Sequence, residues 1–237
     1  MRETVYALGV TLSIVIITYN EEANLARTLE SVMPLVRDGK GEIIVVDSGS
    51  TDRTLEIARS FGAKVFIEPW KGYAAQKNSA IEKARGDWIL SLDADEEVDA
   101  GLAEEIGFLI LGNPRHLVSG GVSVHQKGGV ASTVHGFWIR RKNHLLGRWI
   151  KHGGLWPDPK LRLFRRGEAS FEERAVHETV QVKGATASGD ILGFPCRHLH
   201  TRPPRALAAS APSKNFNEGR NQNEAAGFEG RPGSHEG

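Results

Sequence analysis

Five carboxylates lie within seven positions in the stretch WILSLDADEEVD, residues 88–99. Like charges this close repel one another, and their pKa values rise unless a cation neutralises the cluster. Asp93 and Asp95 are two residues apart, so in an extended segment both side chains point the same way and can reach one divalent cation, directly or through water. Mg²⁺ or Mn²⁺ held by one or two carboxylates usually completes its coordination with water and substrate phosphates. The pair therefore predicts a metal and a phosphate-bearing ligand.

Two other interpretations of these carboxylates are available. One is an acidic turn that only caps the next segment, VDAGLAEEIGFLI. The other is a calcium-binding EF-hand loop that starts at Asp93, but its sixth position is Val98, where the loop needs glycine, and the preceding DWILSL is typical of a strand. The EF-hand is therefore excluded. The chain also lacks G-x-G-x-x-G and G-x-x-x-x-G-K-[ST], and HETVQ at 177–181 lacks zinc-protease spacing, which excludes those three classes of site.

The first hundred residues alternate strand and helix patterns. Four apolar, largely β-branched runs predict buried strands: LSIVIIT, EIIVVD, AKVFIE and DWILSL. Asn20 is the expected cap of a first helix with an apolar stripe at Leu25, Leu29 and Val32, a second helix should stop at Gly62, and a third is expected over 73–84. This order predicts a mainly parallel sheet flanked by helices. Ligands bind beyond the carboxyl ends of such strands, where TYNEE, VDSGSTD and LDADEE converge.

The pattern changes after residue 111. Short runs such as HGFWIRR and KLRLFRR between glycines and prolines predict a smaller antiparallel region. We therefore expect a nucleotide-sugar-binding half at 1–111, an acceptor-side half at 112–200, and a disordered, low-complexity tail at 201–237 on composition.

The bulk composition is that of a soluble globular protein. The 237 residues carry a net charge of +1, which gives no reason to expect nucleic acid as a partner, and the single cysteine permits no intrachain disulfide. The apolar stretch from Val10 to Ile17 is too short to span a bilayer. Any membrane contact is therefore expected to be peripheral.

Four blocks of the sequence together resemble the nucleotide-binding half of glycosyltransferase family 2: SIVIITYNEEANLARTLESV, EIIVVDSGSTDRT, KGYAAQKNSAI and GDWILSLDADEE. The segments FWIRRKNHLLGRWIKHGG, WPDPKLRLFRRG and AVHETV are similar to a narrower branch that contains lipopolysaccharide core β-1,4-glucosyltransferases. The resemblance covers residues 12 to about 200. It implies an α/β GT-A fold and an inverting, metal-dependent transfer of a hexose from a UDP-sugar.

The resemblance also assigns roles to single residues. Thr18, Asn20 and Glu21 would line the nucleoside pocket, and Asp47 would bond the uracil edge. Gln76 and Asn78 fall in a block that faces the nucleotide, while Asp93 and Asp95 would bind Mg²⁺ or Mn²⁺ and the diphosphate. Glu178 would be the base that accepts the proton of the acceptor hydroxyl, with His177 orienting it or binding substrate. Simpler roles are a helix cap for Asn20, a turn residue for Asp47 and a surface pair for His177 and Glu178.

The stretch WIRRKNHLLGRWIK, residues 138–151, interleaves basic with apolar and aromatic residues. Such a mixture suits an anionic membrane surface, a grip on acceptor phosphates, or a solvated face over a small hydrophobic cluster, and the sequence leaves these interpretations open.

The function that the resemblance implies is transfer of a hexose, with glucose favoured, to a lipopolysaccharide inner-core sugar at the cytoplasmic face of a bacterial inner membrane. The sequence leaves two alternatives: a polyprenyl-phosphate acceptor, or a truncated, inactive homologue that only binds nucleotide sugar. The second arises because, after HLH at 198–200, the chain continues with Pro-Pro-Arg and a polar stretch, where relatives of this branch continue with an apolar helical segment.

Overall fold

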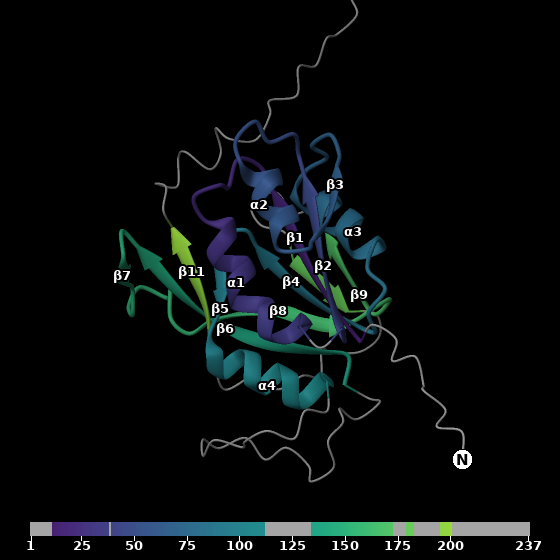
Figure 1. Ribbon diagram of the computed structural model, residues 1–237. Helices are drawn as coiled ribbons and strands as arrows, with labels where there is room; N and C mark the ends of the chain where they lie inside the picture. Colours follow the sequence, from purple (N-terminus) through teal and green to yellow (C-terminus); the bar gives the residue numbers. More distant parts are fainter. Residues whose placement is uncertain (1–10, 38, 112–133, 173–178, 183–194, 201–237) are drawn as a thin grey trace, which may run out of the picture.

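Strands and helices alternate through the first half of the chain, as the sequence predicts (Figure 1). The computed structural model describes residues 11–37, 39–111, 134–172, 179–182 and 195–200. The expected tail at 201–237 lies outside these residues, as does much of the expected acceptor-side half. The first elements are β1 (Leu12–Thr18), α1 (Leu25–Val36), β2 (Gly41–Asp47), α2 (Thr54–Ser60), β3 (Lys64–Ile67), α3 (Tyr73–Glu82), β4 (Trp88–Asp93), β5 (Glu96–Val98) and α4 (Ala100–Leu111).

The later elements are strands: β6 (Gly136–Leu145), β7 (Arg148–Trp149), β8 (Asp158–Arg165), β9 (Ala169–Glu172), β10 (Thr179–Val182) and β11 (Cys196–His200). In the described part of the chain, one sheet has the order β3-β2-β1-β4-β8-β6-β11-β5, with β7 paired to β6. Its first four strands are parallel, whereas β8 pairs antiparallel with both β4 and β6. A small antiparallel sheet joins β9 to β10. The expected α/β fold, with a mainly parallel sheet and an antiparallel region, is confirmed.

The start of the first helix differs from the sequence expectation. Asn20 is not its cap, because α1 begins at Leu25 with Asn24 at the N-cap position. Asn20 instead adopts a left-handed backbone conformation (φ 53°), and its side-chain oxygen accepts a hydrogen bond from the backbone N–H of Thr51 at 2.9 Å. Asparagine tolerates this conformation better than most residues. Its side chain here joins the loops after β1 and β2.

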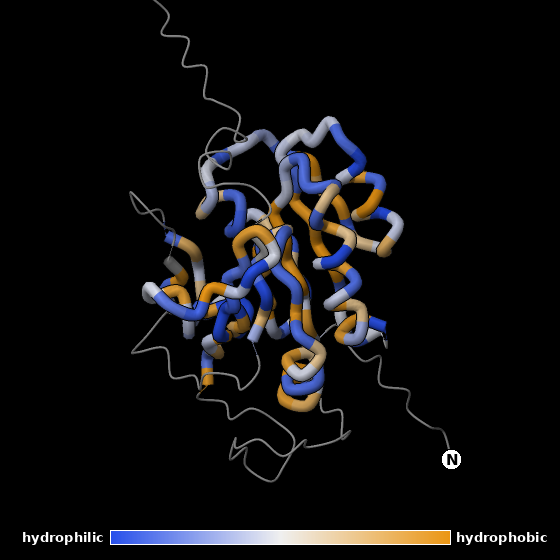
Figure 2. The backbone as a smooth tube through the Cα atoms, turned by 90° about the vertical axis from the view of Figure 1, so that its left-hand side faces the viewer, coloured by the Kyte–Doolittle hydropathy of each residue, from blue (hydrophilic) through white to orange (hydrophobic). Residues whose placement is uncertain are grey.

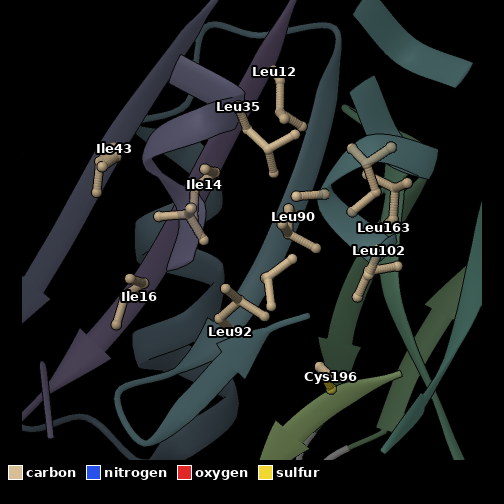
Figure 3. Packing of buried hydrophobic residues seen from close by; sticks show 14 of the residues in the cluster. Leu12, Ile14, Ile16, Leu35, Ile43, Leu90, Leu92, Leu102, Leu163 and Cys196 are labelled. Carbon is tan, nitrogen blue, oxygen red and sulfur yellow. The ribbon is translucent and has the colours of Figure 1, made fainter. Parts of the chain in front are cut away.

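The strands bury side chains on both faces of the sheet. Leu12, Ile14 and Ile16 of β1 and the alternate residues of β4, Leu90 and Leu92, pack toward α1 and α4 (Figure 3). The intervening side chains belong to a second cluster with α3 and β9: Val15, Ile44, Val46, Ile89, Phe164 and Phe171. In Figure 2 the strands at the centre are largely hydrophobic and the loops at the top mostly hydrophilic. Burial on both faces explains why these strands are continuous apolar runs.

Among the described residues, no helix has both the length and the apolar character needed to cross a membrane.

A buried carboxylate links neighbouring segments at the amino-terminal edge of the sheet. Glu42 on β2 is 7% exposed and accepts hydrogen bonds from Ser13 Oγ (2.7 Å), Lys64 Nζ (2.6 Å) and the backbone N–H of Arg85 (2.7 Å). Burial disfavours the charged carboxylate, but these donors outweigh it and lower the pKa of Glu42 from 4.5 to about 2. The Glu42 carboxylate therefore ties β1, β2, β3 and the segment before β4 together.

We predict that Glu42→Gln destabilises the protein at pH 7 by about 2 kcal/mol, because the folded state loses a carboxylate that it holds ionised. A pKa that folding lowers stabilises the fold above the unfolded value of 4.5, and this stabilisation is lost as the pH falls toward 2. Urea unfolding at several pH values should therefore show the two proteins converging in acid. Glu56→Gln, in an exposed pair with Arg53, is the matched control and should show no such convergence. A Glu42→Gln deficit independent of pH would contradict the prediction.

Candidate functional site

The end of β2 is held by a carboxylate with no exposed surface. Asp47 accepts hydrogen bonds from Thr18 Oγ1 at the end of β1 (2.8 Å) and from the backbone N–H groups of Gly49 (2.8 Å) and Ser50 (2.7 Å). The Ser50 hydroxyl donates a further hydrogen bond to the same carboxylate. Two of the predicted nucleoside residues, Thr18 and Asp47, are therefore in direct contact, and Asp47 shapes the turn that follows β2.

The loops after β1 and β2 are joined to each other by hydrogen bonds. The backbone N–H of Asn20 donates to Ser50 Oγ at 2.8 Å, and that of Glu21 donates to Thr54 Oγ1 at 2.8 Å. With the bond from Thr51 to Asn20, these contacts fix the predicted nucleoside residues in one rim.

Asp93, the first carboxylate of the D-x-D pair, lies between two cations. Its Oδ1 is 2.9 Å from Lys77 Nζ on α3, and its Oδ2 accepts a hydrogen bond from Arg162 Nη2 on β8 at 2.6 Å. Burial opposes ionisation, but Arg162 and Lys77 outweigh it and hold the pKa of Asp93 well below its usual range. Asp93 is also level with the end of β1, since it pairs with Ile17 in the register.

The ion-pair network extends from Asp93 to β5, β6 and β8. Glu96 has no exposed surface and accepts a hydrogen bond from Arg162 Nη2 at 2.6 Å, with Arg141 Nη1 at 3.5 Å. Arg141 in turn donates to Asp158 at 2.6 Å, so positive and negative groups alternate from α3 to β8 and β6. The mutual attraction in this buried network raises the pKa of Arg162 against the effect of burial.

Asp95, the second carboxylate of the pair, faces a histidine from the last described strand. His198 Nε2 lies 3.3 Å from Asp95 Oδ2, while its Nδ1 is 3.0 Å from Asn143 Oδ1. Burial alone would lower the pKa of His198, but the carboxylate of Asp95 outweighs it and the pKa rises above its usual value. Asp95 and His198 thus form an oxygen and nitrogen donor pair at the end of the D-x-D turn.

The two predicted residues on α3 differ in their surroundings. Gln76 is fully buried, and neither atom of its side-chain amide has a hydrogen-bond partner among the described residues. Asn78 instead makes two 2.8 Å hydrogen bonds with the backbone of Phe171: Asn78 Nδ2 donates to the carbonyl oxygen, and Asn78 Oδ1 accepts from the backbone N–H. The Asn78 amide therefore joins α3 to β9, whereas the Gln76 amide is buried without a partner among the described residues, which is costly unless water or a ligand supplies one.

The predicted catalytic residues His177 and Glu178 lie outside the described residues. The chain is described again from Thr179, where β10 pairs with β9, and β9 packs against α3.

Sequence reasoning missed four groups at this edge: Lys77, Arg162, His198 and Ser48. The burial of Arg162 could have been predicted, because a single basic residue inside the apolar run LRLF needs a buried acidic partner. Ser48 Oγ is buried without a partner among the described residues, directly after Asp47. Nothing in the sequence indicates that His198, about a hundred residues after Asp95, would meet it.

No set of three or more histidine, cysteine, aspartate or glutamate side chains is arranged to hold a metal ion in the described ranges. A metal ion bound at the Asp95–His198 pair would therefore need further ligands from substrate oxygens and water.

Comparison with known proteins identifies the family of the chain. The sequence profile of the family described as Glycosyl transferase family 2 matches residues 13–169. The lipopolysaccharide core biosynthesis glycosyltransferase LpsC of Rhizobium meliloti is 30% identical over 192 residues, which cover 77% of this chain and 63% of LpsC. An uncharacterized glycosyltransferase of Rickettsia typhi is 46% identical over 98 residues, or 41% of this chain and 32% of that protein. The chain thus matches about a third of the length of the Rickettsia relatives.

The fold has solved counterparts. The crystal structure of S. aureus TarS 1–349 in complex with UDP-GlcNAc superimposes with a TM-score of 0.54, at 15% identity, over 81% of this chain and 59% of that one. The profile match covers more than half of the sequence, and the topology is that of GT-A enzymes. The chain therefore belongs to glycosyltransferase family 2 and has a GT-A fold.

Proposed function

We propose that this chain is an inverting, metal-dependent glycosyltransferase that moves a hexose, with glucose favoured, from a UDP-sugar to an inner-core sugar of lipopolysaccharide. The observation that carries the proposal is the Asp95–His198 donor pair, which lies at the same sheet edge as the Thr18–Asp47 rim. The similarity to LpsC supports the acceptor class.

The residues at this edge fit a divalent cation that also binds a diphosphate. Asp95 offers a carboxylate oxygen and His198 an imidazole nitrogen, a donor combination that suits Mn²⁺. Asp93 has both oxygens on Lys77 and Arg162, so its contribution to the metal would be secondary or through water. When bound, the metal would neutralise the negative charge that develops on the leaving diphosphate.

Asp93, Lys77 and Arg162 have a second role in this proposal. Lys77 is 3% exposed and also lies over the ring of Phe171 at 5.1 Å, so it cannot easily leave Asp93. The two cations keep the Asp93 carboxylate charged and in place beside the proposed diphosphate site.

The nucleoside would lie against the rim formed by the loops after β1 and β2. Asp47 is saturated by protein donors, so we propose that it acts by shaping the turn that presents Ser48. The unpartnered Ser48 hydroxyl and the Gln76 amide then supply hydrogen bonds to the base or ribose, together with Thr18, Asn20 and Glu21 around the pocket. A ligand that partnered these atoms would remove the cost of burying them.

The acceptor hydroxyl must lose a proton as it attacks the anomeric carbon from the face opposite the leaving group. Glu178 is proposed as the base, with His177 positioning it or contacting substrate. β10 begins directly after this pair and is paired to β9, which packs on α3 beside Lys77.

We predict that UDP binds in a Mn²⁺-dependent manner and that Asp95→Asn weakens this binding at least tenfold, since the isosteric amide removes the charged metal ligand. His198→Gln should weaken it in the same direction. Isothermal titration of UDP with Mn²⁺ and with EDTA measures both effects. Glu97→Gln, in the same acidic stretch but paired with Arg27, is the matched control and should bind like the parent. Equal UDP affinity with Mn²⁺ and with EDTA would refute the metal assignment.

We predict that Glu178→Gln lowers transfer and donor hydrolysis by about 10²–10⁴-fold, the range for loss of a general base, while UDP affinity stays the same. Product release from a radiolabelled UDP-sugar measures the rate. Glu172→Gln, an exposed carboxylate on β9, should keep the parent rate. Full activity in Glu178→Gln would require another base, and no turnover in the parent protein would favour an inactive homologue.

We predict that Arg162→Met destabilises the fold by about 3 kcal/mol, because Glu96 is left as a fully buried charge and Asp93 keeps only Lys77. Adding Glu96→Gln should recover part of this loss, which a urea-unfolding double-mutant cycle detects. Arg53→Met, at an exposed ion pair, should leave the unfolding midpoint unchanged. The absence of coupling between positions 162 and 96 would contradict the network.

A further inference from the structure

Exposed leucines are concentrated in the β6–β7 hairpin and the segment that follows it. Leu145, Leu146 and Leu155 are 37%, 81% and 40% exposed, and they account for three of the six large exposed hydrophobic side chains of the described residues. All three lie within eleven positions, although the described residues span well over a hundred. In Figure 1 this hairpin forms an outer edge of the molecule, beside β11.

The conformation at the tip makes the exposure of Leu146 more unusual. Leu145 pairs with Arg148, so Leu146 and Gly147 form a two-residue turn, with φ values of 51° and 76°. Asparagine followed by glycine is the favoured pair for such a turn, because leucine tolerates the left-handed region poorly. At this position leucine has an unfavourable backbone conformation, and its apolar side chain is exposed to water. Both costs suggest that the side chain has an apolar environment in the functional state.

Basic and aromatic side chains surround the leucines. Lys142 and Lys151 lie over the ring of Trp149, at 5.1 and 4.6 Å from its centroid, and Trp149 packs edge-on against Trp156 at 5.3 Å. Arg148 at the turn is exposed, and residues 140–151 contain five lysines and arginines and no acidic residue. We call Lys142, Leu145, Leu146, Arg148, Trp149 and Lys151 the hairpin surface.

We propose that the hairpin surface binds an anionic phospholipid bilayer, with the leucines at the tip entering the boundary between headgroups and acyl chains and the basic residues contacting lipid phosphates. Tryptophan is favoured at that depth, and lysine and arginine are attracted by anionic headgroups. A soluble polyanion would satisfy the charges but not the leucines. A second copy of the hairpin would bring like charges together.

The register of β6 connects this surface with the transferase site. His198 on β11 is level with Asn143 on β6, and Leu146 follows three residues later, about 10 Å further along the strand direction. A bilayer at the tip would therefore lie close to the Asp95–His198 pair. Resting on the proposed function, this placement implies that the acceptor is reached at the membrane surface, as a lipid-linked saccharide.

The test is flotation of the full chain with vesicles of phosphatidylcholine alone and of phosphatidylcholine mixed with phosphatidylglycerol. We expect binding to the anionic vesicles that weakens as salt rises. Leu146→Asp and Arg148→Glu should each reduce the affinity at least fivefold. The matched controls lie at the opposite end of the sheet: Ile67→Asp removes a side chain that is 58% exposed, and Arg59→Glu reverses an exposed charge on α2. Both controls should bind like the parent.

Four results would overturn the proposal that the hairpin surface binds a bilayer. Equal losses in the control variants, or no preference for anionic vesicles, would overturn the proposal. So would salt-sensitive binding that Leu146→Asp leaves intact, because the tip would then not enter the bilayer, or a dimer that Leu146→Asp dissociates without any vesicle binding by the parent. The vesicle assay contains no donor, and UDP titration of Leu146→Asp should match the parent, so failure here and failure of the proposed function are separable.

Discussion

Neutralisation of buried carboxylates is the constraint on which the carboxyl edge of the sheet depends. Asp93 and Glu96 follow a fully buried strand, where unpaired negative charges would be strongly unfavourable, and Arg162 contacts both of them. Lys77 and Arg141 extend the alternation of charge to α3 and β6. Replacing such a network with apolar residues would often cost no stability, so its value lies in geometry. It holds five elements in the one arrangement that presents the D-x-D turn.

The two edges of the sheet use buried polar groups differently. At the amino-terminal edge, Glu42 is enclosed by donors from three other segments. At the carboxyl edge, Ser48 Oγ and the Gln76 amide are buried without partners among the described residues. The groups around Glu42 are satisfied within the protein, whereas Ser48 and Gln76 have hydrogen-bonding capacity that water or a ligand would fill.

The Asp95–His198 pair and the hairpin surface lie on shared strands, β6 and β11. β6 contributes Asn143, which orients His198, and then runs on to the exposed leucines at the tip. β11 contributes His198 while pairing with β6 and β5 on either side. The strand register therefore fixes the distance between the Asp95–His198 pair and the hairpin surface more rigidly than a loop would.

The sequence by itself determined the order of the elements, the buried strands and the edge at which the polar clusters meet, because apolar periodicity and strand direction are local properties. It also indicated the family and the D-x-D pair. The tertiary structure decided which charges compensate one another: Arg162 for Asp93 and Glu96, and His198 for Asp95. It also decided that Asn20 bridges two loops instead of capping a helix, and that Asn78 binds the β9 backbone. These pairings join residues up to about a hundred positions apart, and only the sheet order and register bring such side chains within hydrogen-bonding distance.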